Sequence, residues 1–199
     1  MKDNHSLSII AHTIRQSIDT KTLILNDLEM LAKIATSVDL IVAALKIGGT
    51  IWFCGNGGSA ADAQHLSAEL SGRFYLDRKP FASEALHVNS SFMTAVANDF
   101  GFEHVYERMI EGIGKKGDVL VALSTSGNSP NIVLAVAKAL QMGIKVIGLT
   151  GQTGGKLKNN CDILLKVPSP DTPRIQEAHI MLGHIICELV EKQMVEADI

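Results

Sequence analysis

Three side chains that can transfer protons or bind a metal ion lie close together in the sequence. His65 and Glu69 are four positions apart, and Asp62 precedes His65 by three. Residues at these spacings share one face of an α-helix. Imidazole and carboxylate groups on one face can act as an acid–base pair or as metal ligands, and they also form ordinary hydrogen-bonded pairs on helix surfaces. The spacing alone leaves these interpretations open.

The preceding residues predict how this helix is positioned. Thr50–Cys54 is a short apolar run closed by glycine, which is typical of a buried strand. Glycines dominate residues 55–58, Ser59 is a suitable N-cap, and Ala60–Leu70 favours a helix. A strand, a glycine-rich turn and a helix N-terminus direct free N–H groups and the positive end of the helix dipole to one point. The segment therefore predicts a phosphate site next to the three titratable side chains.

The same loop also fits the dinucleotide fingerprint G-x-G-x-x-A. That fingerprint requires an acidic residue about 20 positions further on, at the end of the next strand, to bind the ribose. The next predicted strand, Glu84–Val88, ends without a carboxylate. We therefore expect no nucleotide cofactor.

A second loop carries several hydroxyl groups. It follows the apolar run Val119–Leu123 and precedes a predicted helix over Asn131–Met142. Its hydroxyl-bearing residues are Ser124, Thr125, Ser126 and Ser129. Serine and threonine are common in turns and caps, but hydroxyls beside a helix N-terminus also bind phosphate without needing lysine. We expect a phosphate contact here.

The last predicted helix, Arg174–Val195, carries three polar side chains among apolar ones. They are Gln176, His179 and His184. A histidine on such a helix is often a hydrogen-bonded core residue. A role in a site and a role in the core both remain open for each histidine.

Strand and helix patterns alternate after residue 47. The predicted strands are 50–54, 84–88, 119–123, 145–149 and 163–167, and the predicted helices are 60–70, 91–97, 103–113, 131–142 and 174–195. This alternation predicts an α/β fold with a doubly wound five-stranded parallel sheet flanked by helices. Residues 1–199 form one domain, in which residues 1–47 are a helical extension that packs on the core or on another subunit.

Composition limits the class of protein. The chain has 199 residues, 46% of them hydrophobic, and a net charge of −3 without a lysine or arginine run. Neither nucleic acid nor a membrane is expected as a partner. Three cysteines without paired spacing are typical of free thiols in a reducing compartment. We expect a cytoplasmic protein.

Four motifs, in this order, resemble those of the phosphoheptose isomerases. They are C-G-N-G-G-S-x-x-D-A-x-H-x-x-x-E-L, N-D-F-G-F, S-T-S-G-N-S and R-I-Q-E-x-H-I-x-x-x-H. Those enzymes are bacterial isomerases of sedoheptulose 7-phosphate built on the sugar isomerase (SIS) domain. The resemblance implies conversion of this ketose to D-glycero-D-manno-heptose 7-phosphate, at the start of ADP-heptose synthesis. It also implies a homotetramer with sites at subunit interfaces.

The resemblance further implies roles for individual residues. Substrate contacts are implied for Asn56, Gly57, Gly58, Ser59, Glu69, Asn98, Asp99, Ser124, Thr125, Ser126, Ser129 and Gln176. Zinc ligation, one ion per subunit, is implied for His65, Glu69, Gln176 and His184, and acid–base catalysis for Glu69 and His184. The sequence departs from the family around Phe81–Phe92 and at Thr172-Pro173, which bears on recognition of the middle hydroxyls of the sugar.

One geometric expectation concerns the implied zinc ligands. Gln176 and His184 are eight positions apart, so a straight helix separates them by about 12 Å along its axis and about 80° around it. A single ion is hard to reach from both residues. We therefore expect some ligands of each site to come from a neighbouring subunit.

A different class of function shares this fold. Some SIS-domain proteins are not enzymes and bind a partner such as the replication initiator. They resemble this chain in both serine-rich loops but do not keep the helix glutamate of the isomerases. Glu69 and His184 are both present here, which favours the isomerase.

Overall fold

A parallel five-stranded sheet forms the centre of the computed structural model, which describes residues 2–196, with side chains from residue 5 onward. The strand order is β2-β1-β3-β4-β5. The strands are β1 (Ile51–Cys54), β2 (Ser83–Ala85), β3 (Val119–Leu123), β4 (Lys145–Thr150) and β5 (Ile163–Lys166). The doubly wound parallel sheet predicted from the sequence is confirmed, with all five strands near their predicted positions.

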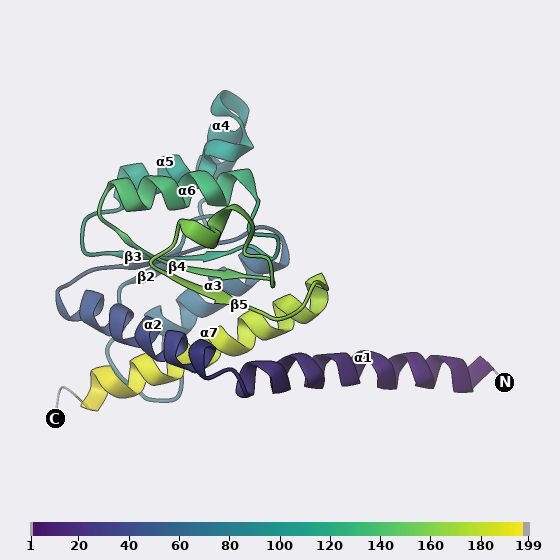
Figure 1. Cartoon of the computed structure of the whole chain (residues 1–199). Helices are drawn as coiled ribbons and strands as arrows, with labels where there is room; N and C mark the ends of the chain where they lie inside the picture. The colour runs from purple at the N-terminus through teal and green to yellow at the C-terminus, as the bar shows by residue number, and fades with distance from the viewer. Residues whose placement is uncertain (1, 197–199) are drawn as a thin grey trace.

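Helices cover both faces of the sheet (Figure 1). On one face lie α2 (Leu28–Lys46), α3 (Gly58–Ser71) and α7 (Thr172–Glu196). On the other lie α5 (Val105–Ile113) and α6 (Pro130–Gln141), with α4 (Ser90–Phe100) beyond them. Short 3₁₀ turns, η1 (Phe102–His104) and η2 (Gly155–Asn159), complete the chain.

The strand residues divide between two cores, one for each layer of helices. Phe53 and Val121 pack with the α2, α3 and α7 side, whereas Cys54 and Leu120 pack with the α5 and α6 side. Every residue of β3 is buried. A strand buried on both faces has a continuous apolar sequence, which explains why β3 was predicted with the correct bounds.

Two predicted segment ends are wrong. Strand β2 ends at Ala85 rather than at Val88, because the chain turns there and the Asn89 side chain accepts a hydrogen bond from the Phe92 N–H to cap α4. Helix α4 continues through Phe100 instead of stopping after Ala97.

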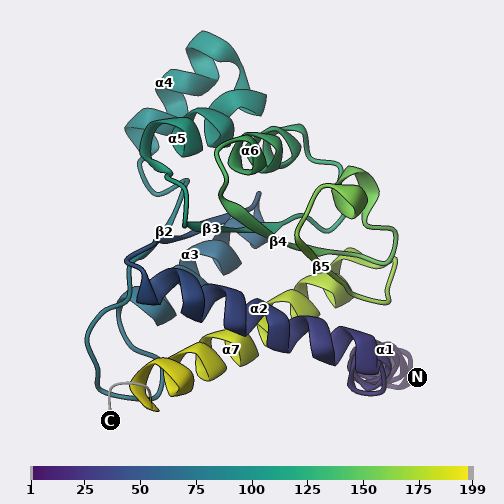
Figure 2. The ribbon, with the colours of Figure 1, turned by 60° about the vertical axis from the view of Figure 1, so that its left-hand side comes forward.

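The N-terminal region is two helices. Helix α1 (Lys2–Leu25) is separated from α2 at Asn26 and Asp27, and the Asp27 carboxylate caps α2 by accepting from the Met30 N–H. Helix α1 projects away from the domain, and Figure 2 shows it almost end-on beside α2 and α7. Its exposed apolar side chains include Leu7, Ile10, Ile14 and Ile18.

None of the helices within residues 2–196 combines the length and the apolar character that crossing a membrane requires.

Candidate active site

The loop after β1 makes a sharp turn into α3. Gly57 has φ +56° and ψ −122°, a conformation that residues with a Cβ atom rarely adopt. The helix begins at Gly58 with Gly57 as its N-cap, so the prediction that Ser59 caps it is wrong. Ser59 is instead buried in the first turn. Within the described residues, no side chain caps α3. The N–H groups of Ser59 and Ala60 donate to the backbone oxygens of Asn56 and Gly57.

The loops that follow β1 and β3 are joined by a pair of amides. The side chains of Asn56 and Asn131 each donate to the other, with both N···O distances 2.8 Å. Strands β1 and β3 are neighbours in the sheet, so their carboxyl ends lie at the same edge. The sequence pattern did not indicate a role for Asn131, although its place directly after Pro130 at the start of α6 puts it beside the serine-rich loop.

The hydroxyl groups of the serine-rich loop lie in two different places. Ser124 is buried, and its Oγ lies 3.2 Å from the Oγ of Ser129. Thr125 and Ser126 face a shallow hollow of about 260 Å³. The hollow is also lined by Asn128, Gln152, Thr153 and Ser169. All of these side chains are polar and uncharged, so an anion bound here would contact hydroxyl, amide and N–H groups.

Apart from these polar loops, the titratable side chains of His65 and Glu69 on α3 meet that of His184 on α7. The Nε2 atoms of His65 and His184 are 2.9 Å apart, and His65 Nε2 lies 3.3 Å from the Glu69 carboxylate. One ligand atom from each of these residues lies within 4.8 Å of the others. The spacing predicted His65 and Glu69 on one face, and the family resemblance implied His184. The structure brings the three side chains together.

Asp62 lies one turn before His65 and is half-buried. Burial raises the pKa of its carboxyl, and the neighbouring His65 and His184 act in the opposite direction. Asp62 is therefore a second carboxyl group beside the cluster, on the same helix as Glu69.

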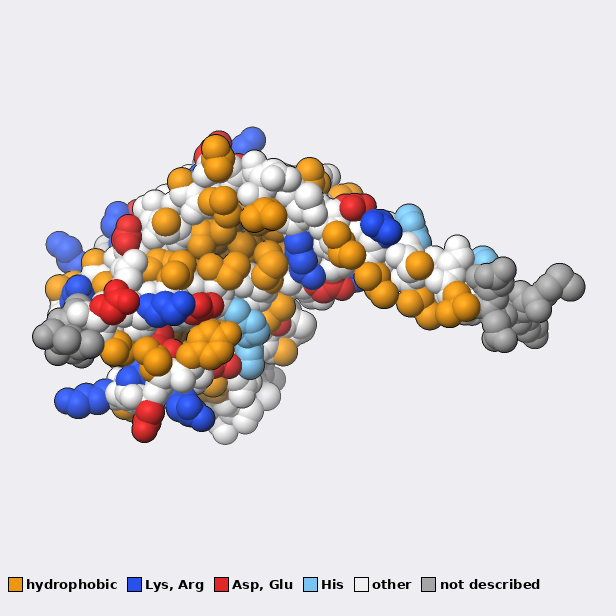
Figure 3. Space-filling model, turned by 90° about the horizontal axis from the view of Figure 1, so that it is seen from below, with side chains coloured by type: hydrophobic (Ala, Val, Ile, Leu, Met, Phe, Trp, Pro, Cys, Tyr) orange, Lys and Arg blue, Asp and Glu red, His pale blue; other side chains and the backbone are white. Residues whose placement is uncertain are grey.

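Figure 3 shows the molecule from the side on which α7 lies. Apolar side chains gather on the middle of this surface, and histidine side chains lie at its edge. The apolar residues that α7 leaves partly exposed include Ile180, Met181, Ile185 and Leu189. His184 of the titratable cluster is partly exposed on the same helix as these apolar residues.

The two histidines of α7 have different surroundings. His179 is completely buried, and burial lowers its pKa to about 4. His184 is partly exposed, and the Phe74 ring lies against it with 5.7 Å between ring centroids. His179 is thus a core residue, whereas His184 belongs to the site.

Gln176 lies with the binding loop and not beside His65. A Cβ atom on Gly58 would come within 2.9 Å of the Gln176 amide nitrogen, so this amide contacts the first turn of α3. His65 is seven residues further along the helix, or about 10 Å of rise. Among the four residues implied as zinc ligands, three are brought together and the fourth lies toward the other end of α3.

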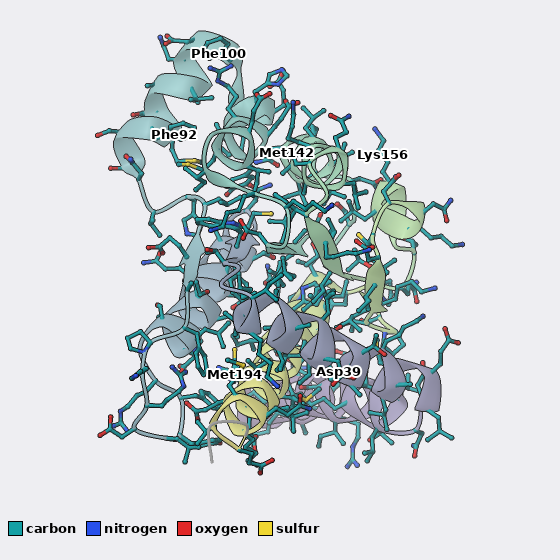
Figure 4. The ribbon with its side chains drawn as sticks, turned by 90° about the vertical axis from the view of Figure 1, so that its left-hand side faces the viewer. Asp39, Phe92, Phe100, Met142, Lys156 and Met194 are labelled. Carbon is teal, nitrogen blue, oxygen red and sulfur yellow. The ribbon has the colours of Figure 1, made fainter. Side chains whose placement is uncertain are left out.

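Asn98 and Asp99 are distant from both groups. They are exposed on α4, where the Asn98 amide donates to the Asp99 carboxylate. Figure 4 shows α4, which carries Phe92 and Phe100, at the opposite end of the molecule from the part of α7 that carries Met194. Within one chain the structure does not bring these two residues to the cluster.

Comparisons with known proteins agree with this arrangement. A family model of the SIS domain matches residues 18–151. The chain is 49% identical over 187 residues to the phosphoheptose isomerase of Clostridium acetobutylicum, covering 94% of this chain and 95% of that relative. It is 53% identical over 158 residues to the phosphoheptose isomerase of Rhodospirillum rubrum, covering 79% and 84%.

Solved structures agree as well. A phosphoheptose isomerase from Francisella tularensis matches with a TM-score of 0.90 at 36% identity, covering 94% of this chain and 98% of that one. The phosphoheptose isomerase from Neisseria gonorrhoeae matches with a TM-score of 0.86 at 41% identity, covering 92% and 98%.

The parallel sheet with its two polar loops, together with the family model, defines an SIS-domain protein. Within this class, identities of 49% and 53% over most of the chain to two phosphoheptose isomerases indicate one family. The chain belongs to the phosphoheptose isomerase family.

Proposed function

We propose that this protein is an aldose–ketose isomerase that converts D-sedoheptulose 7-phosphate to D-glycero-D-manno-heptose 7-phosphate, the first step of ADP-heptose biosynthesis. The observation that carries the proposal is the convergence of His65, Glu69 and His184 from two helices in a chain 49% identical to a phosphoheptose isomerase. A non-catalytic SIS-domain protein has no need of this group, and the relatives at this identity carry the name of the enzyme.

Glu69 is the proposed base. It removes the proton from C1 of the ketose, the C1–C2 double bond forms, and the carbonyl electron pair moves to O2 to give an enediolate. The proton then returns to C2 as O1 loses its own proton and becomes the aldehyde oxygen. The Glu69 side chain is about 20% exposed, so it is open to a substrate while packed beside His65.

His184 is the proposed carrier of the proton between O2 and O1, and it also assists opening of the sugar ring. Its Nε2 faces the side of α3 that carries Glu69. A neutral imidazole has one nitrogen that donates and one that accepts a hydrogen bond, which this transfer requires.

The phosphate of the substrate is proposed to bind at the two polar loops, with Ser59 and the N–H groups around Gly57 and Gly58 on one side. Thr125 and Ser126, which line the hollow beside the serine-rich loop, are proposed to supply further contacts. Contacts from hydroxyl and N–H groups hold a phosphate while allowing release of the product. Ser124, Ser129, Asn56 and Gln176 support or complete these contacts.

Zinc is the metal that we propose for the cluster. Two imidazole nitrogens and one carboxylate oxygen within 4.8 Å are a donor set that suits zinc. The family resemblance implies Gln176 as the fourth ligand, and because Gln176 of the same chain lies against Gly58, we expect that ligand to come from a neighbouring subunit. When bound, the ion supplies Lewis acidity to the sugar oxygens. Because a carboxylate bound to a cation is a weaker base, we expect Glu69 to be free of it while the carbon-bound proton is removed.

The metal has a test that does not use activity. Elemental analysis of the purified protein should find about one zinc per subunit, and His65→Ala should lose most of it. Gln64→Ala, on the exposed side of the same helix, should retain it. A protein that binds no zinc at saturating metal contradicts this part of the proposal.

We also propose a homotetramer whose sites are completed at subunit interfaces. Helix α1 leaves an apolar stripe exposed, with Leu7 62% and Ile14 56% accessible, and large exposed apolar stripes mark interaction surfaces. Asn98 and Asp99 lie on α4, in the layer of helices opposite to α3 and α7, which supports their supply from another copy. Sedimentation that finds a fully active monomer would contradict this assembly.

A cytoplasmic location remains our expectation, supported by three free cysteines, two of them buried.

Turnover is the direct test of the function. The purified protein should convert sedoheptulose 7-phosphate to the aldose, with a rate that falls strongly in Glu69→Gln and not in Gln64→Ala. A protein without turnover that binds a replication initiator belongs to the alternative class instead.

A further inference from the structure

Helix α7 meets α3 along one line of residues that the reaction does not use. A Cβ on Gly183 would lie 2.4 Å from a methyl group of Leu66, so the two helices approach closely there. One turn later, the Cys187 thiol lies 3.8 Å from the Leu66 carbonyl oxygen. A further turn along, at the same four-residue spacing, is Glu191, whose side chain is almost completely buried.

The Glu191 carboxylate is surrounded by donors from the loop that follows α3. It accepts from the backbone N–H groups of Phe74, Tyr75 and Leu76 at 3.0, 2.8 and 2.9 Å, and from Arg78 Nε at 2.9 Å. Burial disfavours the ionised carboxylate, but the three N–H groups and Arg78 outweigh it and lower the pKa of Glu191. Glu191 therefore holds the loop as a charged group.

Arg78 connects this carboxylate to the end of α3. Its Nη2 donates to the carbonyl oxygen of Glu69 at 2.9 Å, and its Nη1 donates to that of Leu70 at 3.0 Å. The last carbonyls of a helix lack partners within the helix, and α3 has no basic residue of its own in its last turn. The guanidinium supplies those hydrogen bonds from outside the helix.

These contacts lead to two residues of the active site, Glu69 and His184. Arg78 binds the backbone of Glu69 itself. The loop fixed by Glu191 carries Phe74, whose ring is inclined by 33° to the imidazole of His184. The two proton-transferring residues are therefore tied to a single buried ion pair.

We propose that Arg78 and Glu191 are positioning residues, which fix helix α3 and the loop 72–80 against α7 so that Glu69 and the Phe74–His184 pair keep their relative placement. The catalytic part of this proposal rests on the isomerase function, whereas the placement of Phe74 against His184 does not. A residue that supports a catalytic group through hydrogen bonds is typically worth 10- to 100-fold in rate.

The first measurement is a comparison of kcat and KM in Glu191→Gln. An amide keeps the size of the side chain but turns a donor toward the N–H groups. We expect kcat to fall about 10- to 100-fold with KM within about twofold, in protein that circular dichroism shows to be folded. The matched control is Glu188→Gln on the same helix, which removes only the surface pair with Lys192. A folded Glu191→Gln protein with the kcat of the native enzyme would overturn the proposal.

The second measurement is independent of activity. In protein with carbon-13-labelled histidine and matched metal content, the ring of Phe74 shifts the His184 resonance, which His184→Asn identifies. We expect Glu191→Gln to move that resonance in the same direction as Phe74→Leu, and Glu188→Gln to leave it in place. An unmoved resonance in Glu191→Gln overturns the proposal even if activity falls.

A third variant covers a failure to fold. Arg78→Lys keeps a positive charge beside Glu191 but cannot reach both helix carbonyls as the guanidinium does. We expect the same His184 shift and the same loss of kcat. Absence of both changes would overturn the proposal. If native protein lacks turnover while the resonance moves as expected, the isomerase function fails and the positioning role of Glu191 stands.

Discussion

Helix α3 presents glycine, hydroxyl and amide groups at its first turn, and imidazole and carboxylate groups in its second half. At the first turn the neighbours are Gly57, the Asn56–Asn131 amide pair and the Gln176 amide. In the second half, His65 and Glu69 meet His184, and Arg78 and Glu191 hold the helix end. The first-turn groups are uncharged hydrogen-bonding groups, whereas the second half carries side chains that can exchange protons. One end is therefore suited to binding an anion, and the other to moving protons.

Glu69→Gln is the strongest test of this division of roles. We expect kcat to fall about 10²- to 10⁴-fold, the usual effect of losing a positioned base, while the substrate still binds. Steady-state kinetics with sedoheptulose 7-phosphate measure both parameters. Gln64→Ala on the same helix should behave as the native enzyme. Near-native turnover by Glu69→Gln would assign the base to another residue, with His65 or Asp62 next.

Glu191→Gln should also change stability in a pH-dependent way. Breaking a buried charge pair costs about 3–5 kcal/mol, so we expect that loss in the free energy of unfolding at neutral pH. Because folding lowers the pKa of Glu191, its contribution is full above the ordinary glutamate pKa of about 4.3 and is lost as the pH falls through the lower pKa of the folded state.

Urea unfolding of native and Glu191→Gln protein between pH 7 and pH 3 measures this difference. The gap between the two proteins should narrow only in the acidic part of the range. The surface pair of Glu188 with Lys192 is the control, since Glu188→Gln should cost less than about 1 kcal/mol. A gap that is constant over the whole range would mean that the Glu191 charge adds no stability.

Ser124→Ala and Ser126→Ala test the binding side. Loss of one hydrogen bond to a charged group costs about 1.5–3 kcal/mol, or roughly 10- to 100-fold in affinity. We expect this effect in KM with little change in kcat, because these hydroxyls contact the non-reacting end of the substrate. If KM is unchanged in both variants, the phosphate binds elsewhere.

Gly183→Ala and Gly58→Ala each add one methyl group. The first tests the contact of α7 with the middle of α3, and the second tests the first turn of α3. The new methyl at residue 183 meets Leu66 within the core, so we expect a loss of about 1–3 kcal/mol of stability. At residue 58 it meets only the tip of the flexible Gln176 side chain, and the loss should stay below about 1 kcal/mol. Thermal unfolding of the two variants compares them, and equal losses would contradict the difference in packing.

The sequence predicted the elements and their order because the local signals were strong. The apolar runs of β3 and β4, and the glycine turn before α3, each depend on residues close together in the chain. Ser59 was assigned as the N-cap from residue type alone, whereas the positive φ of Gly57 starts the helix two residues earlier.

The contacts that hold the site were not predictable in the same way. Asn56 and Asn131 are 75 positions apart, and Phe74 and Glu191 are 117. No local pattern indicates such pairs, although Gly183, Cys187 and Glu191 recur every four residues on one face of α7. Family resemblance supplied the roles of Gln176, Asn98 and Asp99, and the single chain does not bring the last two to the cluster.

The parallel sheet also determines when the site can form during folding. Its binding loops meet only after β1 pairs with β3, which joins Thr50 to Asp118 across 68 positions. His65 meets His184 across 119 positions, and His184 lies on the last helix. Because distant contacts form slowly and chains fold from the N-terminus during synthesis, a nascent chain carries the phosphate loops before it carries the proton-transfer group. Formation of the His65–His184 contact during refolding therefore reports the docking of α7, not the assembly of the sheet.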